Sequence, residues 1–336
     1  MAPNGELDLI RRLRQRIGAA GPRTLVGVGD DAAVIEPGGE LILLTADMFV
    51  EDVHFRRSFA SMRDIGAKCM TANVSDIAAM GGFPTTAVVS LGVPGGCANG
   101  DIDELYDGLL EVLNAHHGEI VGGDIVGSPG GLVVSIALLG AADRERVVPR
   151  SGAVEGDVLL VTGHVGASEA GLLTLESGLP ESEDVAFVRA RHLRPSPRVA
   201  EAQAIIDVAT PHAMIDVSDG LSSDLMHIAD ESGVGIALDQ SAVPIAPETV
   251  RVAEALGIDV AELARGSGEE FEIVVAIPGS ELERTAEHVL AVTGTKVTCI
   301  GEVAPGSEGC FLKKPGGGRV ELARTGYEHL KDDGGR

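Results

Sequence analysis

The chain has 336 residues, of which 44% are hydrophobic and 23% are charged, enough apolar side chains to fill the cores of two α/β domains. Its formal net charge of -25 argues against nucleic acid as a partner, because a duplex-binding surface carries basic side chains that neutralise phosphates. An anionic small substrate is still allowed where cations lie between acid and phosphate.

No apolar run approaches the length of about 18 residues that a membrane helix needs, and the N-terminus alternates charged with apolar residues, unlike a signal peptide. The four cysteines lie far apart, without the CxxC spacing of a zinc site. We therefore expect a cytoplasmic protein with reduced thiols and without a membrane partner.

In chain order, the spacing of apolar residues predicts an amphipathic helix over 5–17 and then an alternation of buried strands and helices. The expected strands of this first series are TLVGVG, ELILLTADMFV, TTAVVSLGV and GLVVSIALLG, with helices over 63–80 and 101–117. The series ends near Pro149, and the polar, glycine-bearing turn RSGAVEGD follows it. We place a domain boundary there.

A second series repeats the pattern. Its expected strands are DVLLVTG, HAMIDVS, VGIALD, EFEIVVAI and KVTCIGEV, and its expected helices lie near 166–177, 198–209, 222–232 and 280–293. The prediction is an α/β protein of two domains, residues 1–149 and 150–336.

Aspartates mark the ends of the apolar runs. Asp30 and Asp31 follow LVGVG, Asp47 follows LILLTA, and Asp124 follows EIVGG, while Asp216 and Asp219 follow HAMI. Any one of them alone would be read as a helix cap or turn residue. Asp76 differs, because it lies in an apolar helical stretch where an unpaired charge would be costly.

Acids from several segments that meet in one crevice cannot all ionise unless cations lie between them. Oxygen ligands without clustered Cys or His favour hard cations, above all Mg²⁺. The glycine turn VGVGDDAAV has the outline of a dinucleotide-binding turn, but its two adjacent carboxylates would repel a pyrophosphate. We therefore expect this turn to hold a metal ion that in turn holds a phosphate.

Ten segments of the chain resemble, in order, those of the thiamine-monophosphate kinase family, which belongs to the same superfamily as aminoimidazole ribonucleotide synthetase. The segments that carry the resemblance most strongly are NVSDIAAMGG and IDVSDGL. The resemblance implies an N-terminal mixed sheet with helices that pairs across a homodimer and a C-terminal α/β sandwich. It also implies transfer of the γ-phosphoryl group of ATP to thiamine monophosphate, with several Mg²⁺ ions.

The resemblance further implies roles for individual residues. Those implied to hold magnesium are Asp30, Thr45, Asp47, Asp76, Asp124, Asp216 and Asp219, with Asp31 in the same turn. Those implied to contact ATP are Tyr106, Gly123, Asp124, Arg150 and Ser218. Those implied to face thiamine monophosphate are His54, Glu269 and Tyr327. No residue is assigned as a general base, because the acceptor phosphate is already largely anionic at pH 7.

The chain departs from the family pattern at three places. Ala46 stands where Ser or Thr is usual, SGEEFE replaces GGEDYE, and GGDI replaces GGDT. These departures bear mainly on the identity of the substrate. Two alternatives stay open: an ATP-dependent ligase like aminoimidazole ribonucleotide synthetase, and a non-catalytic protein that binds metal and nucleotide.

Overall fold

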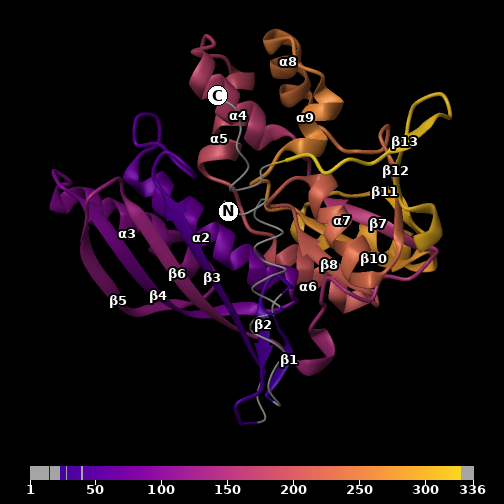
Figure 1. The fold of residues 1–336 in the computed structure, drawn as a ribbon, viewed down its shortest axis with the longest axis horizontal. Coiled ribbons are helices and arrows are strands. Elements are labelled where there is room, and N and C mark those ends of the chain that lie inside the picture. The colour runs from indigo at the N-terminus through magenta and orange to yellow at the C-terminus, as the bar shows by residue number, and fades with distance from the viewer. Residues whose placement is uncertain (1–14, 16–22, 28, 39–40, 327–336) are drawn as a thin grey trace.

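The computed structural model describes residues 15, 23–27, 29–38 and 41–326, and in it the chain folds into two halves that each contain one sheet (Figure 1). The expected helix over 5–17 and Tyr327 lie outside the described residues, apart from residue 15. The alternation of strands and helices predicted from the apolar runs is confirmed within the described part of the chain. None of the helices described there is long and apolar enough to cross a membrane.

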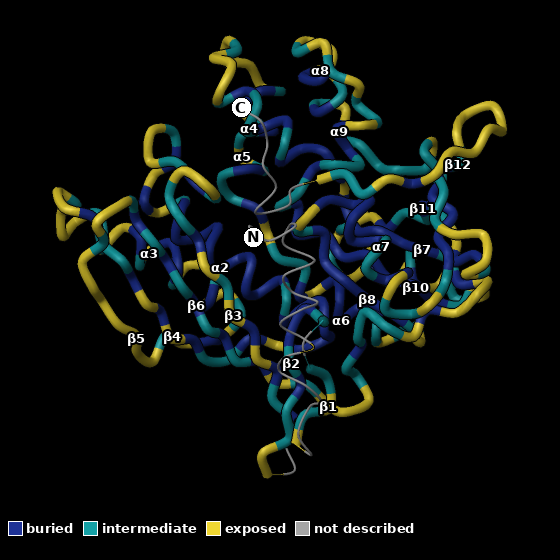
Figure 2. Tube along the Cα trace, viewed as in Figure 1, coloured by how far each residue is buried: buried dark blue, intermediate teal, exposed yellow. Residues whose placement is uncertain are grey.

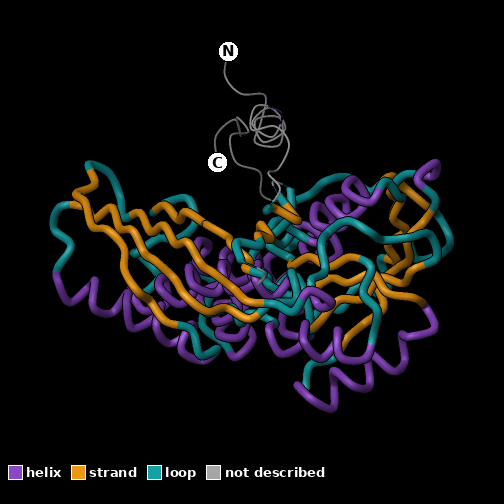
Figure 3. The backbone as a smooth tube through the Cα atoms, turned by 90° about the horizontal axis from the view of Figure 1, so that it is seen from below, coloured by secondary structure: helices purple, strands orange, loops and turns teal. Residues whose placement is uncertain are grey.

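The first half has a mixed sheet in the strand order β1-β2-β3-β6-β4-β5, in which β4 and β5 are parallel and the other neighbours antiparallel. Its strands are β1 (Thr24–Val26), β2 (Ala33–Ile35), β3 (Ile42–Val50), β4 (Phe83–Pro94), β5 (Glu119–Ser128) and β6 (Val133–Ala141), and its helices are α2 (Met62–Ala79) and α3 (Asn99–Ala115). The helices lie along one side of this sheet (Figure 3).

The second half has a seven-stranded sheet in the order β13-β12-β9-β11-β7-β10-β8. Its strands are β7 (Asp157–Thr162), β8 (Ala213–Asp216), β9 (Gly235–Asp239), β10 (Ile273–Pro278), β11 (Val297–Ala304), β12 (Cys310–Lys313) and β13 (Arg319–Glu321). Its helices are α4 (Ala167–Ser177), α5 (Glu183–Leu193), α6 (Val199–Val208), α7 (Leu221–Ser232), α8 (Pro247–Leu256), α9 (Val260–Gly266) and α10 (Leu282–Thr293).

Helix α2 is the central element of the molecule. The side chain of Ser61 caps it by accepting a hydrogen bond from the backbone N–H of Asp64, at 3.1 Å. The helix contacts the N-terminal sheet, α3, and also α6 and β8 of the second half. A Cβ at Gly66 would lie 2.0 Å from the carbonyl oxygen of Leu105 on α3, so only glycine allows the two helices to approach this closely. This packing carries Asp76 to the junction of the two halves.

The two faces of the N-terminal sheet differ. On β3, Leu43 and Phe49 face α2 and are buried, while Leu44 and Met48 alternate with them on the opposite face. That opposite face keeps large apolar side chains exposed, including Met48 at 59% and Val126 at 56%. Strand β5 is exposed over most of its length (Figure 2). The sheet therefore has one packed face and one open apolar face.

Candidate active site

Three aspartates from separate segments meet at the junction of the two halves: Asp31 from the glycine turn, Asp76 from α2 and Asp216 at the end of β8. One carboxylate oxygen of each lies within 4.8 Å of those of the other two. We call this set the acid trio. It joins both halves of the chain, as the sequence analysis expected of acids from distant segments.

The neighbours of the acid trio leave part of its oxygens without partners. The hydroxyl of Thr45 donates a hydrogen bond to Asp76 Oδ2, and that of Ser75 donates to Asp216 Oδ2, each at 2.5 Å. Asp31 Oδ2 and Asp216 Oδ1 are buried and have no hydrogen-bond partner among the residues that the structure describes. Buried carboxylate oxygens without a donor are costly unless a cation faces them, so the residues present fit a divalent ion.

Burial and mutual repulsion shift the pKa values of these acids upward. Burial, followed by the charges of Asp47, Asp216 and Asp31, raises the pKa of Asp76 well above its ordinary value. Burial and the charge of Asp31 raise the pKa of Asp216 to about 8. Asp47 belongs to the same group, because burial and the charges of Asp31 and Asp219 raise its pKa to about 6. Without cations this crevice favours protonated carboxyl groups.

These shifts predict that the protein loses stability as pH rises from 5 to 8 when divalent cations are absent. The pKa of Asp30 is raised to about 7 and that of Asp216 to about 8, so both carboxyls hold protons in the folded chain that the unfolded chain releases. Raising the pH therefore favours unfolding. We expect the melting temperature in EDTA to fall by roughly 5 °C or more between pH 5 and pH 8.

Magnesium should remove most of that loss, because an ion bound only by the folded state stabilises it. Melting temperatures measured across the same pH range with and without MgCl₂ check this. Curves that coincide in EDTA and in magnesium would contradict a cation site at the acid trio.

The two adjacent acids of the glycine turn have different positions. The carboxylate of Asp30 accepts hydrogen bonds from the backbone N–H groups of Asp31, at 3.0 Å, and of Arg150, at 3.1 and 3.2 Å. Asp31 reaches the acid trio instead, and the guanidinium of Arg150 donates a hydrogen bond to it. The structure thus brings Asp31 into the cluster and sets Asp30 beside it, whereas the resemblance implied Asp30 as the ligand and gave Asp31 the less certain role.

Asp124 lies away from the acid trio within one chain. It occupies the interior of β5, not its end. Across the sheet, Asp124 is in register with Ser90, Ser135 and Met48, so it lies on the open face. Asp47 pairs with the buried Ile136 on the opposite, helix-covered face. Two strands separate β3 from β5. A single chain therefore does not bring the carboxylates of Asp47 and Asp124 together, although the resemblance implies that both hold magnesium.

A second group of possible ligands consists of Asp219, Asp224 and His227, whose ligand atoms lie within 4.8 Å of one another. Asp224 is buried and accepts a hydrogen bond from the backbone N–H of Gly220 at 3.1 Å, which caps α7. Burial lowers the pKa of His227 to about 4, so its imidazole is neutral. Asp224 and His227 were not selected from the sequence, although their spacing on α7 places them on one helix face.

The residues implied to contact ATP have separate surroundings. Arg150 is partly buried against the acid trio, Ser218 follows β8, and Tyr106 packs partly buried against the N-terminal core. A Cβ at Gly123 would lie 1.7 Å from the carbonyl oxygen of Val89, so β4 and β5 can pair there only around glycine. The structure places Arg150 and Ser218, but not Tyr106 or Gly123, beside the carboxylates.

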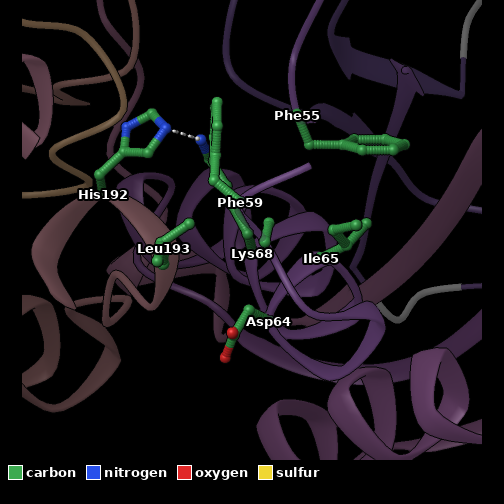
Figure 4. Close-up of a pocket in the computed structure, with 8 residues that line it drawn as sticks. Phe55, Phe59, Asp64, Ile65, Lys68, His192 and Leu193 are labelled. Carbon is green, nitrogen blue, oxygen red and sulfur yellow. Dashed lines mark hydrogen bonds between the residues drawn. The ribbon is translucent and has the colours of Figure 1, made fainter. Parts of the chain in front are cut away.

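At the implied substrate end, Glu269 meets a lysine that the sequence analysis did not select. The ammonium group of Lys68 donates a hydrogen bond to Glu269 Oε2 at 2.6 Å and lies 3.4 Å from the carbonyl oxygen of His54. Lys68, His192, Phe55 and Phe59 line a pocket next to this pair (Figure 4). A lysine within an otherwise apolar helix was the available sequence signal.

The SGEEFE departure has a structural explanation. Glu270 Oε1 accepts hydrogen bonds from the backbone N–H groups of Gly166 and Ser168, at 2.7 and 3.0 Å, at the start of α4. The hydroxyl of Ser267 donates to the same oxygen at 2.5 Å. Ser267 and Glu270 therefore cap the start of α4, while Ala46 lies on the open face of β3.

Comparison with known proteins identifies relatives over almost the whole chain. The chain matches the AIR synthase related protein family, its N-terminal domain over residues 29–142 and its C-terminal domain over residues 154–312. A thiamine-monophosphate kinase of Bacillus subtilis (strain 168) is 35% identical over 337 residues, which cover 97% of this chain and 99% of that protein.

Solved structures agree with the sequence relatives. Thiamine monophosphate kinase from Aquifex aeolicus superposes with a TM-score of 0.79 at 31% identity, covering 93% of this chain and 97% of the other. The structure of AaThiL complexed with AMPPCP and TMP superposes with a TM-score of 0.84, also at 31% identity, and covers 97% of both chains.

Proposed function

The chain belongs to the thiamine-monophosphate kinase family of AIR synthase related proteins, and from this we propose that it transfers the γ-phosphoryl group of ATP to the phosphate of thiamine monophosphate. The product is thiamine diphosphate. One relative, AaThiL, was solved in complex with AMPPCP and TMP, which supports ATP and thiamine monophosphate as the two substrates. The acid trio is the observation in this chain that carries the proposal.

The difficulty of this reaction is electrostatic. An oxygen of the acceptor phosphate attacks the γ-phosphorus, and the bond from that phosphorus to the oxygen of ADP breaks. Because the second pKa of a phosphate monoester is near 6, the acceptor needs no strong base at pH 7. Two anions must still approach in line, and positioning with charge neutralisation supplies most of the catalysis.

We propose Mg²⁺ as the ion of the acid trio, since carboxylate and hydroxyl oxygens without sulfur ligands suit a hard cation. When bound, magnesium supplies charge neutralisation and a template for phosphate oxygens. Asp31, Asp76 and Asp216 would hold it, with Asp47 and Thr45 at its side. The implied ligands Asp30, Asp124 and Asp219 remain predictions, as do Tyr106, Gly123 and Ser218 for ATP and His54 and Tyr327 for the acceptor.

Arg150 fits a phosphate-binding role as well as its ion pair with Asp31. Its Nε is buried and has no hydrogen-bond partner among the described residues. A planar guanidinium with a donor to spare suits an oxyanion. We propose that it contacts a phosphate of ATP while it holds the glycine turn.

We also propose that two copies pair through the open face of the N-terminal sheet. Large exposed apolar side chains gather there, among them Met48, Val88 and Val126 at 59%, 42% and 56% exposure, and such a patch marks an interaction surface. Sedimentation that shows only single chains would contradict this pairing.

We propose two domains, residues 1–149 and 150–336. We also propose a cytoplasmic location, since all four cysteines are free thiols.

The function is tested by mass-spectrometric product analysis with ATP, MgCl₂ and thiamine monophosphate. We expect thiamine diphosphate and ADP in equal amounts, and neither product when EDTA replaces magnesium. Formylglycinamidine ribonucleotide in place of thiamine monophosphate should give no turnover. Product from that substrate would support the ligase alternative, and binding of ATP without any product would support the non-catalytic one.

A further inference from the structure

Lys68 is a buried charge on the same helix that carries Asp76. Its side chain retains only 7% of its surface exposed. Lysines are almost never buried to this extent without a partner, because the ammonium group loses its hydration. Lys68 is eight positions before Asp76, about 12 Å along the axis of α2. One rigid helix thus links the acid trio to the pocket near Glu269.

The three donors of the Lys68 ammonium group each have an acceptor. Nζ is 2.6 Å from Glu269 Oε2, 3.4 Å from the carbonyl oxygen of His54 and 3.5 Å from His192 Nε2. Figure 4 shows the contact between Lys68 and His192. Burial lowers the pKa of His192 to about 4, so its ring is neutral. Its Nε2 therefore accepts from Lys68, and its Nδ1 donates to the hydroxyl of Ser168 at 3.3 Å.

The backbone at Glu269 is bent to bring its side chain to Lys68. Glu269 has a φ of 57°, in the left-handed region that non-glycine residues rarely adopt. Its N–H donates to the carbonyl oxygen of Ser218 at 2.7 Å, which fixes the turn. Such strain persists only where the surroundings over-determine it, and it gathers at functional sites. The neighbouring Glu270 accepts hydrogen bonds from the backbone N–H groups of Gly166 and Ser168 at the start of α4 instead.

The pocket beside this pair has apolar walls and a charged end. Phe55, Phe59, Ile65 and Leu193 supply the walls, and Asp64, Lys68 and His192 supply polar atoms (Figure 4). The side chain of Glu269 keeps 31% of its surface exposed, so a carboxylate held by Lys68 is still accessible. An accessible carboxylate next to aromatic side chains suits a flat, nitrogen-bearing cation.

We propose that Lys68 is a positioning residue for the acceptor substrate: it holds Glu269 as a carboxylate beside this pocket, where Glu269 binds the amine- and cation-bearing ring system of thiamine monophosphate. The inference rests on the proposed function and adds a residue to it. Lys68 acts through Glu269 and does not touch the reacting phosphates. Loss of Lys68 should therefore weaken the binding of the acceptor, without slowing the chemical step and without weakening the binding of ATP.

The test uses the full chain with Lys68→Met, which keeps the length of the side chain and removes its charge. We expect the KM for thiamine monophosphate to rise at least about 10-fold, while kcat and the KM for ATP stay within about 2-fold. Arg63→Met, which removes an exposed ion pair of the same helix with Glu111, is the matched control and should leave all three constants unchanged.

A second readout separates positioning from mere support of the fold. Burial tends to raise the pKa of Glu269, and the charge of Lys68 lowers it, with smaller contributions from His192 and His54. In Lys68→Met the carboxyl should therefore hold its proton to a higher pH, and the KM for thiamine monophosphate should improve as pH rises from 6 to 9. The KM of the wild type should be nearly flat across that range.

The double variant Lys68→Met/Glu269→Gln decides the matter even if the single lysine variant does not fold, because the amide needs no countercharge. It should match Glu269→Gln alone in KM, since Lys68 acts only through that carboxylate. Three results would overturn the inference. The double variant could bind thiamine monophosphate as well as the wild type does, or its loss of binding could equal the sum of the losses of the two single variants. Lys68→Met could also lower kcat while its KM stays unchanged. Absence of turnover in the wild type would instead overturn the proposed function, and this inference with it.

Discussion

Replacing Asp76 by Asn is expected to lower kcat by on the order of 10² to 10³-fold, the loss that follows removal of one group stabilising charge in a transition state. Asp76 is the helix-borne member of the acid trio, and its carboxylate lies within 4.8 Å of those of Asp31 and Asp216. An amide has one oxygen and no charge, so it should hold a divalent ion poorly. Turnover of thiamine monophosphate at saturating ATP and MgCl₂ measures the effect.

The fold should survive this change. Thr45 donates to Asp76 Oδ2, and an amide oxygen accepts the same hydrogen bond. Because burial and neighbouring acids raise the pKa of Asp76, its removal takes away repulsion, and the variant should melt no lower than the wild type at pH 8 in EDTA. Asp103→Asn, an exposed acid on α3, is the control. Activity of Asp76→Asn near that of the control would remove Asp76 from the metal site.

Replacing Arg150 by Met is expected to produce the largest loss of stability. Arg150 pairs with Asp31, whose side chain is completely buried, and its backbone N–H holds Asp30. Removing one partner of a buried ion pair costs about 3–5 kcal/mol, because the other charge stays buried and unpaired. In a chain of this size that corresponds to a fall in melting temperature of roughly 5–10 °C in EDTA.

Magnesium should recover part of the stability of Arg150→Met, since a cation can take over the neutralisation of Asp31, while the KM for ATP should stay raised because the phosphate contact is lost. Arg144→Met is the matched control: its partner Glu36 is at the surface, with Arg144 57% exposed, and such pairs contribute at most about 1 kcal/mol. Equal melting temperatures for the two variants would contradict the role given to Arg150.

The periodicity of apolar residues predicted most of the fold because the elements concerned are buried. The stretch around Asp76 lies in α2, which is buried on nearly all sides, and its apolar residues were visible in the sequence. Helices α5, α8 and α9 were not predicted, since they are short and rich in charge. Strand β3 runs through Asp47 to Val50, as expected from ELILLTADMFV, whereas β5 was not predicted as a strand, since glycines interrupt its apolar residues.

The sequence predicted that acids from distant segments meet, but it did not predict which carboxylates lie in contact. Asp30 and Asp31 are adjacent, and only the direction of the backbone in the turn decides that Asp31 reaches the acid trio. Asp124 is on the open face because of the register of β5 with β4, which no local pattern reveals. Lys68 and His192 depend on contacts between segments far apart in the chain, so their roles became visible only in three dimensions.

The central claim is that carboxylates from both halves share divalent ions at the acid trio. Crystals grown with Mn²⁺, ATP analogue and thiamine monophosphate, measured for anomalous scattering, test it most directly. We predict manganese peaks in coordination contact with oxygens of Asp31, Asp76 and Asp216, and loss of those peaks in Asp76→Asn. Peaks confined to other acids, with the three carboxylates bound to no ion, would contradict it.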